Sequence, residues 1–251
     1  MSKNNPELGR AVNKHLDSLG INTPITELVK ADRDEKIQKI TSLTKDMLEV
    51  LGLDLTDDSL EETPLRVAKM YVDEIFSGLR YDTFPKCTTV ENKFNIGEEF
   101  VLEKNITMYS DCEHHLRPII GHAHIAYIPG KKVLGLSKLN RVTQYFAQRP
   151  QVQERLTQQI AHAIAFITDS QNVMVVVDAG HTCVSQRGIK DTQSTTVTAT
   201  CLGLFGEHNS ELRKEVLAKI NRQMVSTGLQ SHSSLTQTTA TSWIIIGVYN
   251  E

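Results

Sequence analysis

The sequence predicts an α+β fold in which two β-hairpins flank a pair of helices. Three observations predict it. Apolar residues recur at helical spacing in the first third of the chain, β-branched and aromatic runs begin near Phe100, and two helical patterns separate the first pair of runs from the second. Consecutive strands on each side of the helices favour an antiparallel sheet over a doubly wound one. Open strand edges in such a sheet favour oligomerisation.

Residues 1–95 form a predicted N-terminal helical region. Asp32 is a candidate N-cap for one helix, and Thr63 is a candidate N-cap followed by Pro64 at the first helical position of another. The apolar stripes of these two helices are Ile37, Ile40, Leu43, Met47 and Leu51, and then Val67, Tyr71, Ile75 and Leu79.

Residues 96–225 carry the predicted sheet. FVLEKNITMYSD and GHAHIAYIP form the first pair of strands, and VMVVVDAGHTCV and STTVTATCLG form the second. Between them, a helix begins at Ser137 and is broken at Arg149-Pro150, because proline disfavours helix in the residue before it. The next helix places Val152, Leu156, Ile160, Ala163 and Ile167 on one face. A last helix spans about Ser210 to Met224, and residues 226–251 have the Ser/Thr-rich composition of a flexible tail.

Composition excludes several classes of protein. The 27 Lys and Arg residues against 30 Asp and Glu give a net charge of −3, which argues against a nucleic-acid-binding protein. No stretch approaches the roughly 20 apolar residues of a membrane helix, and the N-terminus lacks a secretory pattern. We therefore expect a cytoplasmic protein without a membrane partner, whose four cysteines are thiols or metal ligands.

The densest chemical pattern is Cys112-Glu113-His114-His115, followed much later by His181-Thr182-Cys183. Cys112 and His115 can share one metal ion in a turn, and His181 and Cys183 project to one face if they lie on a strand. Thiolate and imidazole ligands together suit zinc. Spacing leaves open a closed structural site, with His114 or His181 as fourth ligand, and an open catalytic site that keeps a water. The remaining cysteines and most other histidines are expected to be packed or surface residues: Cys87, Cys201, His122, His124, His162 and His208.

A second group of residues suits an anionic ligand. Ser137 lies at a helix start with Lys138 and Arg141 on one face, and helix N-termini favour phosphate, although the same pattern fits an ordinary capped helix. Arg187 follows Cys183 closely, and Arg66 lies on the helix after Pro64.

Gln153 and Glu154 open the helix after Pro150. An acidic residue there commonly complements the helix dipole. Alternatively, its carboxylate could accept two hydrogen bonds from the edge of guanine, which adenine cannot supply.

These residues and their surroundings resemble GTP cyclohydrolase I. The matching stretches span roughly Asp57 to Leu204 and are DSLEETPLRVAKMYVDEIFSGL, CEHH, GLSKLNRVTQYFAQRPQVQERLTQQI and HTCVSQRGI. The resemblance implies a T-fold, in which strands of neighbouring subunits join into a barrel, usually in a toroidal homodecamer with active sites between subunits. It also implies hydrolysis of GTP to 7,8-dihydroneopterin triphosphate and formate, the first step of tetrahydrofolate biosynthesis.

The resemblance further implies a role for each candidate residue. It implies a catalytic zinc ion on Cys112, His115 and Cys183, whose bound water attacks C8 of guanine. His114 then protonates N7, His181 shuttles further protons and Ser137 lies near the ribose. The triphosphate is expected at Lys138, Arg141, Arg187 and Arg66, and the guanine edge at Gln153 and Glu154.

Two other interpretations fit parts of the pattern. One is a nitrile reductase of the same fold, which uses a catalytic cysteine and a nicotinamide cofactor. The other is a non-catalytic, zinc-stabilised nucleotide-binding or scaffold protein, in which a fourth ligand closes the metal site.

Overall fold

The computed structural model describes residues 3–93, 99–208 and 210–222. The helices are α1 (Pro6–Ser18), α2 (Arg33–Val50), α3 (Thr63–Lys69), α4 (Leu136–Ala147), α5 (Gln153–Thr168), α6 (Thr182–Ser185) and α7 (Glu211–Asn221). The strands are β1 (Thr89–Glu91), β2 (Val101–Cys112), β3 (Pro118–Tyr127), β4 (Lys132–Leu134), β5 (Pro150–Gln151), β6 (Val173–His181) and β7 (Thr196–Cys201). The tail predicted for 226–251 lies outside the described residues.

The main sheet has the order β5-β2-β3-β6-β7, and a separate small sheet pairs β1 with β4. β2, β3, β6 and β7 pair antiparallel with their neighbours, whereas the short β5 runs parallel to β2. The predicted order of two strands, two helices and two strands is confirmed. A mixed α+β fold with this sheet and helix pair is consistent with a T-fold.

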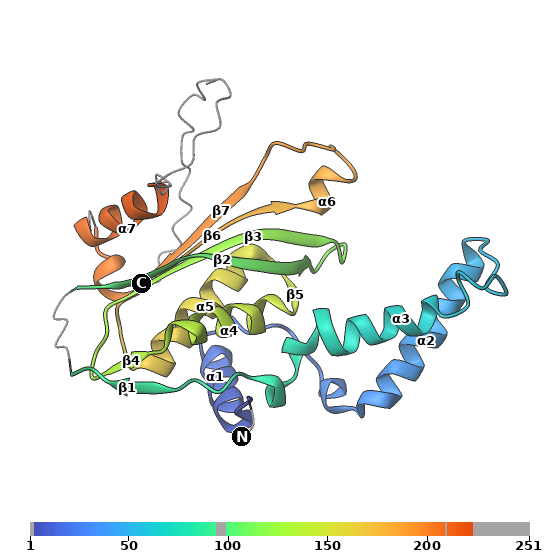
Figure 1. Ribbon diagram of the computed structural model, residues 1–251, viewed down its shortest axis with the longest axis horizontal. Helices are drawn as coiled ribbons and strands as arrows, with labels where there is room; N and C mark the ends of the chain where they lie inside the picture. Colours follow the sequence, from blue (N-terminus) through green and yellow to red (C-terminus); the bar gives the residue numbers. More distant parts are fainter. Residues whose placement is uncertain (1–2, 94–98, 209, 223–251) are drawn as a thin grey trace, which may run out of the picture.

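Both faces of the sheet are covered over part of their length (Figure 1). Ile125 and Val175 point toward α4 and α5 in the larger core, while their neighbours Ala126 and Met174 pack with Val216 of α7 on the opposite face. Alternate side chains of a strand point to opposite faces, so burial on both faces requires a continuous apolar run. This explains why the sequence of β6 begins with the continuous apolar run VMVVV.

The break at Arg149-Pro150 is confirmed, and Arg149 is buried within it. Its side chain donates hydrogen bonds to the carbonyl of Gly78 (2.8 Å) and to Oδ1 of Asn13 (3.3 Å), and its guanidinium lies 4.7 Å from the ring centroid of Tyr145. Pro150 and Gln151 then pair with the last residues of β2. The break therefore places the beginning of α5 beside Cys112.

The helices of residues 3–93 do not share one core. α1 packs on α5 and adds Val12 and Leu16 to the larger core, whereas α2 and α3 bury a small cluster of their own around Ile37. The predicted cap of α2 is confirmed, because Asp32 accepts hydrogen bonds from the backbone N–H groups of Asp34 and Glu35.

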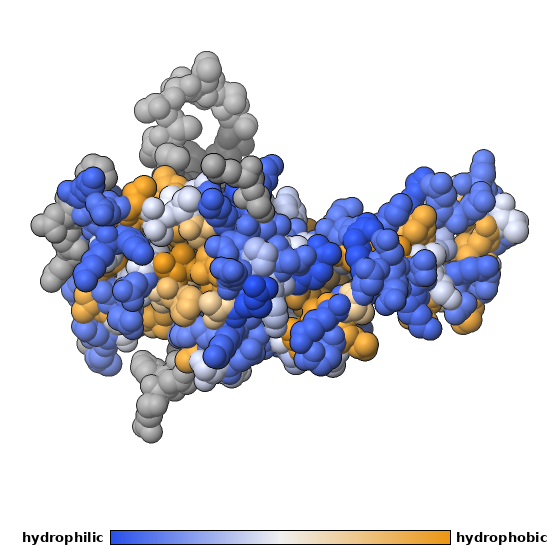
Figure 2. Space-filling view, turned by 90° about the horizontal axis from the view of Figure 1, so that it is seen from below, coloured by the Kyte–Doolittle hydropathy of each residue, from blue (hydrophilic) through white to orange (hydrophobic). Residues whose placement is uncertain are grey.

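The α2–α3 pair projects from the body of the chain (Figure 1), and Figure 2 shows apolar residues scattered over this arm. Most of the stripe predicted to face inward on α2 is exposed in the single chain: Leu43 is 54%, Met47 54% and Leu51 69% exposed. A single chain therefore leaves much of this arm's apolar surface uncovered.

The prediction for the start of α3 was wrong by one residue. Glu62 occupies the cap position and Thr63 is already helical, while the Glu62 side chain pairs with Arg66 and does not cap the helix. The buried face of this segment consists of Pro64, Ala68 and Val72, and the predicted stripe is only partly buried. The chain turns in a wider π-type helix from Met70 to Ile75, which rotates the later side chains away from the α-helical period.

No helix among the described residues combines the length and apolar composition needed to cross a bilayer.

Candidate metal centre and nucleotide site

Three of the predicted ligands converge in the folded chain. One possible ligand atom from each of Cys112, His115 and Cys183 lies within 4.8 Å of the other two. β3 causes this convergence because it pairs with β2, which ends at Cys112, and with β6, which leads directly into Cys183. Asp111 of β2 lies opposite Pro118, and Ile119 lies opposite His181 of β6. The ends of β2 and β6 are therefore held at the same edge of the sheet.

The expectation that His181 and Cys183 share a strand face was wrong. His181 is the last residue of β6, and Cys183 lies on the short helical turn α6. The side chain of Thr182 donates a hydrogen bond to the carbonyl of Pro118 at 2.7 Å, which holds this turn against β3. Helical curvature, and not strand alternation, directs Cys183 toward Cys112.

A tight turn after β2 brings Cys112 and His115 together. The backbone N–H of Leu116 donates to the carbonyl of Cys112 at 2.8 Å, and the N–H of Cys112 donates to the carbonyl of Arg117 at 2.9 Å. Leu116 adopts a left-handed conformation with φ of 49°, which reverses the chain. As a result, Sγ of Cys112 lies 3.9 Å from Nδ1 of His115.

This group of side chains fits zinc chemically. Two thiols and one imidazole are soft to borderline ligands, and three protein ligands leave one tetrahedral position for water or substrate. Burial and the neighbouring Cys112 thiol raise the pKa of Cys183. A bound cation has the opposite effect, because it favours the thiolate.

His114 and His181 lie beside the metal group but outside it, within the part of the chain that the structure describes. Nδ1 of His114 is 3.8 Å from Sγ of Cys112, and the His114 side chain is 64% exposed. His181 is half-buried, and Nε2 of its ring lies 2.8 Å from Oε1 of Gln153. Burial lowers the pKa of His181, while the charge of Glu154 acts in the opposite direction.

The acidic residue between the ligands is held by an arginine that the sequence analysis missed. Arg155 of α5 forms an ion pair with Glu113 and donates a further hydrogen bond to Oε1 of Gln151 at 3.3 Å. The backbone N–H of Glu113 donates to the carbonyl of Gln151 at 3.0 Å. Glu113 lies inside the CEHH motif and could have been singled out there, but no local pattern in the sequence marks Arg155.

The candidate phosphate residues are distributed over several elements. Gly135 is the N-cap of α4, so Ser137 is the second helical residue and not the cap. Ser137 and Arg141 are exposed and Lys138 is half-buried, all on the first turns of α4. Arg141 also lines a pocket of about 330 Å³ together with Lys3.

Arg187 and Arg66 occupy very different places. Nη1 of Arg187 lies 2.9 Å from Nε2 of His115, which puts a cation at the metal group. Arg66 lies on the projecting arm, where its hydrogen bonds go to Glu62.

The two residues predicted at the guanine edge differ in exposure. Glu154 is exposed in the first turn of α5, whereas Gln153 is 1% exposed. The amide nitrogen of Gln153 contacts the carbonyls of Val177 and Thr196, and its amide oxygen contacts His181. Of the two, only Glu154 presents its side chain to solvent.

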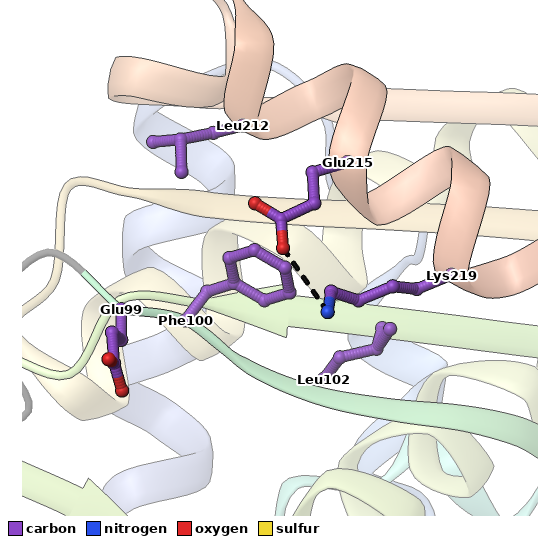
Figure 3. A pocket seen from close by; sticks show the side chains of 6 residues that line it. All are labelled: Glu99, Phe100, Leu102, Leu212, Glu215 and Lys219. Atoms are coloured by element: carbon purple, nitrogen blue, oxygen red, sulfur yellow. Dashed lines mark ion pairs between the residues drawn. The ribbon is translucent and has the colours of Figure 1, made fainter.

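A pocket of about 560 Å³ lies at the other end of the sheet (Figure 3). It is bounded by the residues before and at the start of β2 and by α7, where Glu215 and Lys219 form an ion pair at 3.2 Å. Its lining residues are Glu99, Phe100, Leu102, Leu212, Glu215 and Lys219. Cys112 is at the opposite end of β2, so this pocket does not belong to the metal group.

Comparison with known proteins agrees with these motifs. The family model described as GTP cyclohydrolase I matches residues 40–221. GTP cyclohydrolase 1 of Actinobacillus pleuropneumoniae serotype 5b (strain L20) is 54% identical over 211 residues, which cover 84% of this chain and 95% of that protein. GTP cyclohydrolase 1 of Vibrio vulnificus (strain YJ016) is 50% identical over 211 residues, covering 84% of this chain and 96% of its own length.

A solved structure of an archaeosine synthase QueF-Like in the apo form matches 41% of this chain and 93% of its own, with 14% identity and a TM-score of 0.35. The stretch matched by the family model contains the positions of all the candidate site residues, from Arg66 to Arg187. The chain belongs to the GTP cyclohydrolase I family.

Proposed function

We propose that this protein hydrolyses GTP to 7,8-dihydroneopterin triphosphate and formate, using one zinc ion on Cys112, His115 and Cys183. The observation that supports this most directly is the convergence of these three ligands in a chain 54% identical to a GTP cyclohydrolase 1. The reaction would be the first step of tetrahydrofolate biosynthesis. We place it in the cytoplasm, where the two thiols stay reduced, with no membrane or nucleic-acid partner.

Zinc held by these residues would supply a Lewis acid that lowers the pKa of a water molecule near the purine. Around it, the side chains of the protein move and hold protons. His114 is exposed at the edge of the metal group and would deliver a proton to N7 of guanine as the bond from C8 to N9 weakens. His181 would serve the later proton transfers that accompany formate release.

The remaining residues would bind and orient the nucleotide. The exposed carboxylate of Glu154 would accept hydrogen bonds from N1–H and the exocyclic amine of guanine. Ser137 would lie near the ribose, and the triphosphate would meet Lys138, Arg141 and Arg187. Arg66, which is on the projecting arm, would contribute to this triphosphate-binding site from a neighbouring subunit.

We further propose that the chain assembles into a homodecamer with sites between subunits. The exposed apolar residues of the α2–α3 arm support an assembly, and so do Tyr109 (61% exposed) and Ile120 (47% exposed) on the sheet. Sedimentation of the purified protein would give the subunit number. A monodisperse monomer with full activity would contradict this part of the proposal.

The function is tested by incubating the protein with GTP, with and without a chelator. Zinc-loaded protein is expected to release formate and a product that becomes a fluorescent pterin on oxidation, and the chelated protein should stay folded but inactive. Failure of the zinc-loaded protein to release formate would overturn the proposal. Unfolding on chelation, without formate release before it, would instead favour the zinc-stabilised scaffold.

A further inference from the structure

Hydrogen bonding determines which way the buried amide of Gln153 faces. Its nitrogen lies 3.1 Å from the carbonyl oxygen of Val177 and 2.8 Å from that of Thr196. A carbonyl oxygen can only accept a hydrogen bond, so the side of the amide that faces these two strands must be the NH₂ group. The reverse orientation would place three oxygens against one another in a buried site.

The orientation of Gln153 in turn determines where the His181 ring carries its proton. The amide oxygen lies 2.8 Å from Nε2 of His181 and can only accept, so Nε2 must carry a hydrogen. The lone pair of the neutral ring is then on Nδ1. Gln153 therefore fixes both the tautomer and the direction of the His181 ring.

Two threonines complete this arrangement. The hydroxyl of Thr157 donates to the backbone carbonyl of Gln153 at 2.7 Å and lies 2.6 Å from the hydroxyl of Thr198, which also lies 3.2 Å from the Gln153 amide nitrogen. The two hydrogens of the Gln153 amide are shared among three acceptors, namely the carbonyls of Val177 and Thr196 and the hydroxyl of Thr198. The Thr198 hydroxyl in turn can donate to Thr157. A glutamine connected in this way to α5, β6 and β7 has little freedom to rotate.

We propose that Gln153 is a positioning residue, which holds His181 in one tautomer and one orientation for proton transfer and does not read the guanine edge. Both ends of its amide are already used within the protein, whereas recognition of a base would require one of them to be released. This inference rests on the proposed function, since it assigns the orientation of a histidine that acts in that reaction.

The replacement Gln153→Met tests this proposal, because it keeps the length of the side chain and removes both hydrogen-bonding ends. The turnover number for formate release is expected to fall about 10- to 100-fold, the range typical of losing a partner that orients a metal-ligating histidine. Bound zinc and the KM for GTP should stay close to those of the parent protein. A raised KM with unchanged turnover would show that Gln153 binds the base, and would overturn the proposal.

A double-mutant cycle separates positioning from general damage. If Gln153 acts through His181, adding Gln153→Met to His181→Ala should lower turnover no further than His181→Ala alone. Independent, multiplying losses would overturn the proposal. Full turnover by His181→Ala would remove the role proposed for that histidine, while leaving zinc-dependent hydrolysis of GTP intact as a separate result.

Gln159 offers a matched control on the same helix. It is also fully buried, and its amide donates to the carbonyl of Ile21 at 2.9 Å and accepts from the side chain of Gln151 at 2.8 Å, so neither end of the amide is bonded to His181. Gln159→Met should lower thermal stability but keep the parent turnover number, and an equal loss of turnover would count against the proposal. If Gln153→Met does not fold, Gln153→Asn, which retains an amide but is too short to span the same partners, should show the same loss of turnover at unchanged KM.

Discussion

Arg187 donates a hydrogen bond to Nε2 of His115 over 2.9 Å. A guanidinium has no acceptor, so Nε2 must offer its lone pair. A metal ion on Nε2 would take that lone pair, and a metal ion on Nδ1 would leave the ring proton on Nε2. In either case a bound metal ion would break this bond and would leave the Arg187 cation beside the site, available to the anionic substrate that we propose.

We expect Arg187→Met to separate metal binding from substrate binding. The substitution removes a competing donor and a positive charge from His115, so zinc affinity should be retained or increased. The KM for GTP should rise about tenfold or more, since a charge-assisted hydrogen bond contributes about 1.5–3 kcal/mol. Competitive zinc titration and steady-state kinetics measure the two effects, with Lys190→Met, on the same exposed loop, as the control for loss of a nearby charge.

Substitution of either sulfur ligand should remove the metal and the activity together. Cys112→Ser and Cys183→Ser each take one thiolate from a site with three protein ligands, so bound zinc and formate release should both be lost. Cys87→Ser and Cys201→Ser are matched controls, because neither thiol belongs to the group of described residues that can share an ion, and burial raises the pKa of both, that of Cys87 to about 11. Elemental analysis beside a formate assay checks this, and retained metal with full turnover in Cys183→Ser would refute the ligand assignment.

His114→Ala should stop ring opening without loss of metal. His114 lies outside the group that can share an ion, so zinc content and GTP binding should persist, while turnover should fall about 100-fold or more with the loss of a general acid. His122→Ala, at another exposed histidine, should leave turnover unchanged. Loss of zinc from His114→Ala would show instead that this ring is a ligand.

Glu154→Ala should weaken the preference for GTP over ATP. The carboxylate is proposed to pair with an edge that only guanine presents, so binding of GTP should weaken while that of ATP should change little. Glu211→Ala removes an exposed acidic residue from the first turn of α7 and controls for simple helix-dipole effects, which are worth about 0.3–1 kcal/mol. Inhibition of GTP turnover by ATP measures selectivity, and unchanged rejection of ATP by Glu154→Ala would contradict the base-reading role.

Local patterns in the sequence were sufficient for the order of the four long strands and of helices α4 and α5, and for two of the three residues of the metal group. Hydrophobic period distinguishes β6, with its continuous apolar run, from the amphipathic α5, and a proline marks the break between α4 and α5. Cys112 and His115 belong to one short turn, so their spacing alone indicates that they can meet. Helix starts were less accurate, because Thr63 and Ser137 have capping chemistry but lie one and two residues inside their helices.

The rest was decided by tertiary structure. Cys183 reaches Cys112 because β3 pairs with both β2 and β6, and it lies on a helical turn after β6 that no strand period predicts. Gln153 and Glu154 are adjacent in the sequence, yet the first is buried against β6 and β7 and the second is exposed. Hydrophobic periodicity depends only on residues that are close together in the sequence, so it can be recognised there. The contact partner of each side chain depends on the register and packing of strands that lie far apart in the chain.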